Sequence, residues 1–137
     1  MTPYVQRYIP ENEVILFEEI SRRIHALPDL DLGKDEDGRL VILSCHMLAR
    51  AVARVFRLNY CDGYFYQTYR HSWVQTPTGH IIDVYPVAML GGPVLYDGLS
   101  GSPARALYTN TSAMAISNGK FNTKSFRRSI ERIRRAL

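Results

Sequence analysis

Residues 70–86, RHSWVQTPTGHIIDVYP, predict a β-hairpin. The β-branched and aromatic residues on either side are typical of strands, and the Thr-Pro-Thr-Gly between them is typical of a turn. Side chains alternate between the two faces of a strand, so a loop with an odd number of residues, such as 77–79, places His71 and Asp83 on one face. A carboxylate can then orient the imidazole. We therefore expect His71 and Asp83 to pair across adjacent antiparallel strands.

A candidate nucleophile precedes this hairpin. Cys45 opens the apolar stretch CHMLARAVARVF, within a region (residues 40–58) that predicts a helix with Ser44 as its N-cap. Residues 41–43 also fit a helix, so its start is left open. The unpaired N–H groups and the dipole at a helix N-terminus favour a thiolate. The alternative is that Cys45 is a small buried hydrophobic residue, the commonest role of a free cysteine.

Two further helices are predicted, one near each end of the chain. Residues 11–27 carry an apolar stripe between two prolines that suit a helix start and stop. Residues from about 122 to 137 carry a second stripe, with basic residues mostly on the other faces. The stripes are Val14, Phe17, Ile20, Ile24 and Leu27 in the first, and Phe126, Ile130, Ile133 and Leu137 in the second.

The remaining segments predict strands and loops. Residues 60–69, YCDGYFYQTY, predict a strand in which Gly63 marks a bulge or a turn. Residues 87–110 predict a loop-rich segment with one short strand at 94–96. We expect an α+β fold in a single domain, residues 1–137, with the Cys45 helix packed on an antiparallel sheet of three to five strands.

Positive charge is concentrated at the C-terminal end. The net charge is +4, yet residues 120–137 hold seven of the 17 basic residues and one acidic residue, Glu131. The rest of the chain is therefore slightly acidic. The basic helix is expected to dock through its apolar stripe, with binding of a nucleic acid, an acidic protein or a membrane surface as the alternative.

The composition also bounds the location and the cofactors. No run of 18 apolar residues and no leader sequence is found, so we expect neither a membrane span nor a secretory signal, and a cytoplasmic location. A reducing compartment would keep both cysteines as thiols, with a disulfide between them as the alternative. We expect no cofactor and no metal, because Cys61, His71 and His80 lack zinc-site spacing and the acidic segment 28–39 does not match an EF-hand.

The other histidines and Cys61 are expected to have structural roles. His46 should point about 100° around the helix from Cys45 and be a poor base for it. His80 lies in the predicted turn and should be exposed, while Cys61 and Trp73 should pack within the sheet.

Three segments together resemble the transglutaminase-like branch of the papain-like cysteine peptidase superfamily. They are SCHMLARAVARVF (44–56), RHSWV (70–74) and GHIIDVYP (79–86). The resemblance covers residues 45–86 and rests on the chain order Cys, His, Asp and on the strand motifs around the last two. Short bacterial members with this layout include peptidases and the leader-peptide proteases of lasso-peptide pathways.

The resemblance implies a papain-like or transglutaminase-like core in which Cys45 is the nucleophile, His71 the base and Asp83 the orienting carboxylate. Such a triad forms a thioester acyl-enzyme from an amide bond of a peptide or protein substrate. Water as acceptor makes a hydrolase, and an amine makes an acyltransferase. The alternatives are a catalytically silent papain-like module that binds a peptide or protein, and an adaptor that uses the basic C-terminal helix.

Overall fold

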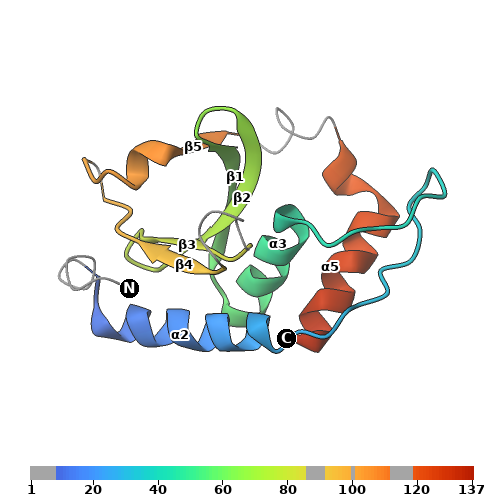
Figure 1. Ribbon diagram of the computed structural model, residues 1–137, viewed down its shortest axis with the longest axis horizontal. Helices are drawn as coiled ribbons and strands as arrows, with labels where there is room; N and C mark the ends of the chain where they lie inside the picture. The colour runs from blue at the N-terminus through green and yellow to red at the C-terminus, as the bar shows by residue number, and fades with distance from the viewer. Residues whose placement is uncertain (1–8, 86–91, 100, 112–118) are drawn as a thin grey trace.

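The computed structural model describes residues 9–85, 92–99, 101–111 and 119–137. Over these residues the protein is an α+β structure with three α-helices and a five-stranded antiparallel sheet (Figure 1). The elements are α2 (Glu11–His25), α3 (Cys45–Phe56), β1 (Asn59–Phe65), β2 (Tyr69–Gln75), β3 (Ile81–Asp83), β4 (Val94–Tyr96), the 3-10 turn η1 (Arg105–Leu107), β5 (Tyr108–Thr111), the 3-10 turn η2 (Lys120–Asn122) and α5 (Lys124–Ala136). Pro86, the last residue of the predicted hairpin, and the predicted loop as far as Gly91 lie outside the described residues.

The strands follow the order β4-β3-β2-β1-β5, so β2 lies at the centre of the sheet. The sheet is strongly curled. Tyr96 of β4 and Tyr108 of β5 lie on opposite edges, yet their ring centroids are 6.1 Å apart. Four strand spacings in a flat sheet would separate these edges by about 19 Å. One face of the sheet is therefore concave, and the two edge strands approach each other across it.

The β2–β3 hairpin has the predicted register. The backbone N–H of Thr76 donates to the carbonyl of His80 at 2.9 Å, which leaves three residues in the loop. The last of them, Gly79, has φ 93°, a left-handed conformation that favours glycine. With this odd loop, His71 and Asp83 lie on the same face of the sheet. The expectation that they share a face is confirmed.

The predicted strand 60–69 contains nearly all of β1, a turn and the first residue of β2. β1 stops at Phe65, and β2 begins at Tyr69. Between them, Tyr66 and Gln67 both have positive φ, at 58° and 59°. Two consecutive left-handed residues match the twist of a tight hairpin, although neither residue has the sequence preference for it. The run of aromatic residues favours a strand and gives no indication of this turn.

Gly63 is neither a bulge nor a turn. It pairs regularly with His71 on one side and with Asn110 on the other. A Cβ at this position would lie 1.9 Å from the carbonyl oxygen of Thr109, so the glycine allows β5 to approach β1 closely. The sequence signal was correct in marking a special backbone position, but the special feature is the neighbouring strand.

Helix α3 begins at Cys45, and residues 41–43 are not helical. The Ser44 side chain caps the helix by accepting a hydrogen bond from the N–H of Met47 at 3.3 Å. After its first turn, α3 packs on the convex face of the sheet through buried side chains. Leu48, Ala49 and Val52 of the helix share one hydrophobic core with Val74 and Ile82 of the sheet and with residues of α2 and α5.

The concave face has its own aromatic cluster. Trp73, Ile81 and Tyr108 are buried there, with Phe65 and Tyr96 packed against them. The predicted short strand at residues 94–96 is confirmed as β4. Strand β5, however, lies in a segment that the sequence predicts as loop, because Gly, Pro and Ser surround it. Its first residue, Tyr108, is only 1% exposed.

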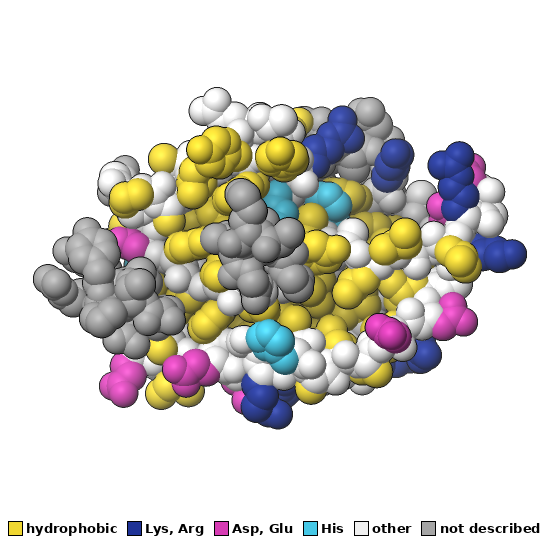
Figure 2. Space-filling model, viewed as in Figure 1, with side chains coloured by type: hydrophobic (Ala, Val, Ile, Leu, Met, Phe, Trp, Pro, Cys, Tyr) yellow, Lys and Arg dark blue, Asp and Glu magenta, His cyan; other side chains and the backbone are white. Residues whose placement is uncertain are grey.

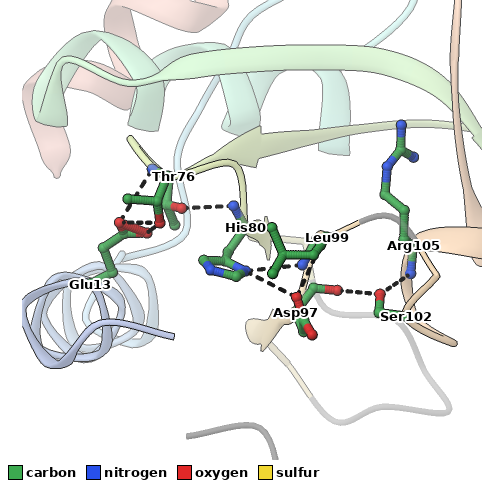
Figure 3. Close-up of polar contacts among 9 residues, drawn as sticks. Glu13, Thr76, His80, Asp97, Leu99, Ser102 and Arg105 are labelled. Carbon is green, nitrogen blue, oxygen red and sulfur yellow. Dashed lines mark hydrogen bonds and ion pairs between the residues drawn. The ribbon is translucent and has the colours of Figure 1, made fainter. Parts of the chain in front are cut away.

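Two contacts anchor the β2–β3 loop. Glu13 of α2 accepts hydrogen bonds from the Thr78 hydroxyl at 2.8 and 2.7 Å. On the other side, His80 Nδ1 accepts from the N–H of Gly98 at 3.0 Å and lies 3.4 Å from Asp97 (Figure 3). The prediction that His80 is exposed is therefore wrong, since only 2% of it is exposed. The segment after β4 covers it.

Helix α5 is a folded part of the structure. Phe126, Ile130 and Ile133 are buried in the same core as α3, as the apolar stripe predicts, while Leu137 is half-buried. The acidic loop meets the start of this helix, where Glu36 accepts hydrogen bonds from the backbone N–H and the hydroxyl of Ser125. An acidic residue at a helix N-terminus also complements the helix dipole.

The surface of one face is shown in Figure 2. Hydrophobic side chains cover much of its centre, and Lys and Arg side chains gather on the side of α5. Among the helices of the described residues, none combines the length and the apolar character needed to cross a membrane.

Replacing Ile133 by alanine tests the docking of α5. Ile133 is 0% exposed, so the loss of its buried side chain should lower the free energy of unfolding by about 2–5 kcal/mol, measured by urea denaturation. Arg135→Ala, on the exposed side of the same helix, is the control and should change it by less than about 0.5 kcal/mol. Equal effects of the two substitutions would contradict the packing described.

Candidate active site

Cys45 occupies the first position of α3, where the helix leaves backbone N–H groups without intrahelical acceptors. Its side chain is neither fully buried nor fully exposed, and both it and Cys61 are free thiols. The alternative of a disulfide between the two cysteines is thereby excluded. The position is suited to a nucleophile, because the positive end of the helix dipole stabilises a thiolate and an approaching carbonyl can still reach the sulfur.

His71 and Asp83 form a closely bonded pair on β2 and β3. His71 Nε2 lies 2.9 and 2.8 Å from the two carboxylate oxygens of Asp83. Because a carboxylate only accepts, Nε2 carries the proton and Nδ1 is the nitrogen left for the sulfur. The Cys45 thiol interacts with the same imidazole, since each of the two groups shifts the pKa of the other. The structure thus brings together the three residues that the sequence singled out.

Tyr108 is a fourth member of this chain that sequence reasoning missed. Its hydroxyl donates to Asp83 Oδ2 at 2.8 Å. Burial, the negative charge of Asp83 and the hydrogen bond between them raise the pKa of Tyr108, so the phenol stays protonated and can only donate to the carboxylate. An aromatic residue in a loop-rich segment carries no spacing signal, and only the curl of the sheet brings Tyr108 to Asp83.

Aromatic rings surround the His71 imidazole. Trp73 is stacked against it with ring centroids 6.2 Å apart, and Phe65 and Tyr108 lie at 6.0 and 6.3 Å. Trp73 is 2% exposed, which confirms that it packs in the core. These rings exclude water from the His71–Asp83 hydrogen bonds, and a drier environment strengthens their electrostatic interaction.

The electrostatics favour an ion pair between Cys45 and His71. Burial raises the pKa of the Cys45 thiol, but hydrogen bonds to His46 and His71 and the charges of both imidazoles lower it to about 6. Burial lowers the pKa of His71, whereas its hydrogen bonds to Asp83 and Cys45 and their negative charges raise it to about 9. Between these two values the thiolate and the imidazolium coexist.

His46 also acts on the thiol, because its imidazole contributes to the lowered pKa of Cys45. Its Nδ1 lies 2.6 Å from the hydroxyl of Ser72 on β2. The angle between the two side chains around the helix therefore does not isolate His46 from Cys45, while its being a poor base for the thiol stays a prediction. The hydrogen bond with Ser72 holds the imidazole against the sheet.

Cys61 has a different environment. It lies on β1, where burial and the adjacent charge of Asp62 raise its pKa. It packs against the aromatic cluster of the concave face, in agreement with the prediction from sequence. Cys61 therefore provides an internal reference thiol.

An apolar groove of about 420 Å³ runs up to the N-terminus of α3. It reaches Ser44, the residue before Cys45, and its walls include Met47 and Phe121. Leu40 and Ile42, which also line it, are 73% and 80% exposed, unusually high for large aliphatic side chains. The groove offers space for an apolar side chain next to the nucleophile.

Within the described residues, no group of three or more His, Cys, Asp and Glu side chains is arranged to hold a metal ion. No protein-family model, curated protein or solved structure matches this chain. The geometry around Cys45 is therefore the basis for a functional proposal.

The rate of alkylation of each cysteine tests the ion pair. Iodoacetamide should label Cys45 with a midpoint near pH 6, because the thiolate is the reactive form, while Cys61 should react only at much higher pH. His71→Ala should move the Cys45 midpoint upward, and labelling at pH 6 should fall about tenfold for each unit of the shift. Asp83→Asn should have a smaller effect, since Asp83 acts through the imidazole.

The folded protein is labelled at pH values between 5 and 10 and then digested. Mass spectrometry of the peptides gives the labelling rates of Cys45 and Cys61 from one sample. If Cys45 is unreactive at pH 6 in the folded protein, or reacts identically in the His71→Ala variant, the ion pair described here does not exist.

Proposed function

We propose that the protein is a thiol-dependent hydrolase or acyltransferase that acts on amide or peptide bonds through Cys45, His71 and Asp83. The observation that carries the proposal is the His71 imidazole, which is hydrogen-bonded to a fully buried carboxylate and interacts with the thiol of a helix-start cysteine. A nucleophile, a base and a group that orients the base are the parts that acyl transfer requires.

The topology supports a papain-like core of the transglutaminase-like branch. In that arrangement a cysteine at the start of a helix precedes a histidine and an aspartate on successive antiparallel strands. Here Cys45 starts α3, and His71 and Asp83 lie on β2 and β3, which are neighbours in the sheet that α3 packs against. The imidazole nitrogen that faces the carboxylate is Nε2, which leaves Nδ1 for the thiol.

The reaction follows from these positions. The Cys45 thiolate attacks the carbonyl carbon of an amide, and the carbonyl π electrons move to the oxygen. When the intermediate collapses, the C–N bond breaks and the His71 imidazolium gives its proton to the leaving amine. A thioester remains on Cys45. Water attacks it as His71 removes a proton, which releases a carboxylic acid and the thiol. An amine acceptor would instead give a new amide.

The backbone contributes the oxyanion site. The N–H of Cys45 belongs to the first turn of α3, where intrahelical acceptors are lacking and the helix dipole attracts negative charge. One oxyanion donor typically contributes about 10²- to 10³-fold in rate. The apolar groove beside Ser44 can hold a side chain of the acyl segment while the carbonyl faces this N–H.

The two alternative functions require different features. A catalytically silent binding module requires a buried or misaligned cysteine, whereas Cys45 is partly exposed and its pKa is lowered by His71. An adaptor requires the C-terminal helix to act apart from the domain, whereas the apolar side of α5 lies in the common core. The exposed basic side of α5 remains available to an anionic partner.

Trapping of the acyl-enzyme tests the proposed reaction. A mixture of synthetic peptides that covers all residue types should be cleaved by the protein and, with hydroxylamine present, should also give peptide hydroxamates, which form only from an activated acyl group such as a thioester. Mass spectrometry detects both products. Cys45→Ala should abolish both, and His71→Ala should lower kcat/KM by about 10²- to 10⁴-fold.

Cys61→Ala is the matched control for this experiment and should retain activity, since Cys61 takes no part in the hydrogen bonds of His71 and Asp83. Turnover that survives Cys45→Ala would overturn the assignment. An intact, folded protein with a reactive Cys45 but no product from any peptide would favour the binding module.

The pH dependence of kcat/KM should be bell-shaped, with limbs near pH 6 and pH 9. Below the lower value Cys45 is a protonated, weakly nucleophilic thiol, and above the upper value His71 has no proton for the leaving amine. Steady-state rates with the best peptide of the mixture give the profile. A single rise with a midpoint near 8.5 would indicate an ordinary thiol without an imidazolium partner.

A further inference from the structure

A second chain of hydrogen-bonded residues lies beside Cys45 and begins at the next residue of α3. The His46 imidazole interacts with the Cys45 thiol, and its Nδ1 lies 2.6 Å from the Ser72 hydroxyl. Ser72 in turn lies 2.6 Å from Asp62, whose carboxylate is paired with Arg50. The reaction described above uses none of the residues beyond Cys45 in this chain.

The positions of the protons in this chain can be deduced. A carboxylate accepts only, so the single hydroxyl proton of Ser72 goes to Asp62 Oδ1. Ser72 can then only accept from His46, which means that the Nδ1 of His46 carries a proton. His46 therefore has a defined tautomer, and its Nε2 is protonated only when the ring is an imidazolium.

The far end of the chain is fixed by a buried ion pair. Arg50 donates to both oxygens of Asp62 at 2.9 and 2.8 Å, with 6% and 5% of the two side chains exposed. The same guanidinium donates to the backbone carbonyl of His46 at 3.1 Å. It also lies over the Phe121 ring at 4.4 Å, and that ring is 4.7 Å from the imidazole of His46. Both the backbone and the ring of His46 are thus held in place.

The two chains on the thiol differ in charge. Asp83 is bonded to His71 itself and to a neutral phenol, so its negative charge acts on that imidazole. Arg50 largely neutralises the negative charge of Asp62, which is linked to His46 only through Ser72. A negative charge thus acts directly on His71, whereas His46 is held by an ion pair whose charges largely cancel.

We propose that His46, held through Ser72 by the buried Asp62–Arg50 pair, is a positioning residue that fixes the Cys45 thiolate from the side of α3. The inference deepens the proposed function and rests on it. Two neighbouring residues of β2, which point to opposite faces of the sheet, then act on one sulfur: His71 directly and Ser72 through His46. These two imidazoles are the side chains that lower the pKa of the thiol.

Titration of the thiolate by its absorbance at 240 nm, in a Cys61→Ala background, tests the role of His46. His46→Phe keeps an aromatic ring against Phe121 but removes both nitrogens, and should raise the midpoint by about one pH unit. Ser72→Ala keeps His46 but removes the hydroxyl that holds its ring, and should raise the midpoint by less. His71→Ala should raise it further than His46→Phe, yet leave it below the ordinary value of about 8.5, and the His46→Phe/His71→Ala double variant should reach that value.

His25→Ala, which removes an exposed histidine of α2, is the control and should not move the midpoint. Circular dichroism shows which variants fold, and if His46→Phe does not fold, Ser72→Ala decides the question. If His46→Phe leaves the midpoint unchanged while His71→Ala brings it to about 8.5, the inference is wrong and the proposed function stands. Ser72→Ala takes the place of His46→Phe in this comparison if His46→Phe does not fold. An unchanged midpoint in His71→Ala as well would overturn both.

Discussion

The register of the β2–β3 hairpin is the constraint on which the candidate site depends. Side chains alternate along a strand, so a shift of one residue would move Asp83 to the face opposite His71 and leave a buried carboxylate without its partner. The positive φ of Gly79 sets the loop, and Glu13 and His80 hold it from both sides. Helix α2 and the segment after β4 therefore contribute to the geometry of residues they do not touch.

Two buried carboxylates, one on each face of the sheet, determine much of the polar organisation. Asp83 on the concave face is satisfied by His71 and Tyr108, and Asp62 on the convex face is satisfied by Arg50 and Ser72. A buried charge without partners would cost several kcal/mol, so each carboxylate requires its donors to be in place. Each network includes an imidazole that lowers the pKa of Cys45. Folding of the sheet thereby brings polar groups from its two faces to one sulfur atom.

Local signals in the sequence were sufficient for part of this structure. The turn residues around Gly79 predicted the register, and Ser44 predicted the start of α3, because caps and turns depend on neighbouring residues. Tyr108 could not be predicted, since its contact with Asp83 depends on β5 pairing with β1 and on the curl of the sheet. The orientation of the His46 ring could not be predicted either, because it depends on Ser72, which is 26 residues away in the chain.

The place of Tyr108 in the chain has a consequence for biosynthesis. Cys45, His71 and Asp83 all emerge from the ribosome before Tyr108, which is the first residue of β5. Until β5 pairs with β1, Asp83 lacks one of its hydrogen-bond donors and the aromatic wall beside His71 is incomplete. The His71–Asp83 pair therefore reaches its final environment only after a strand that is synthesised later has joined the edge of the sheet.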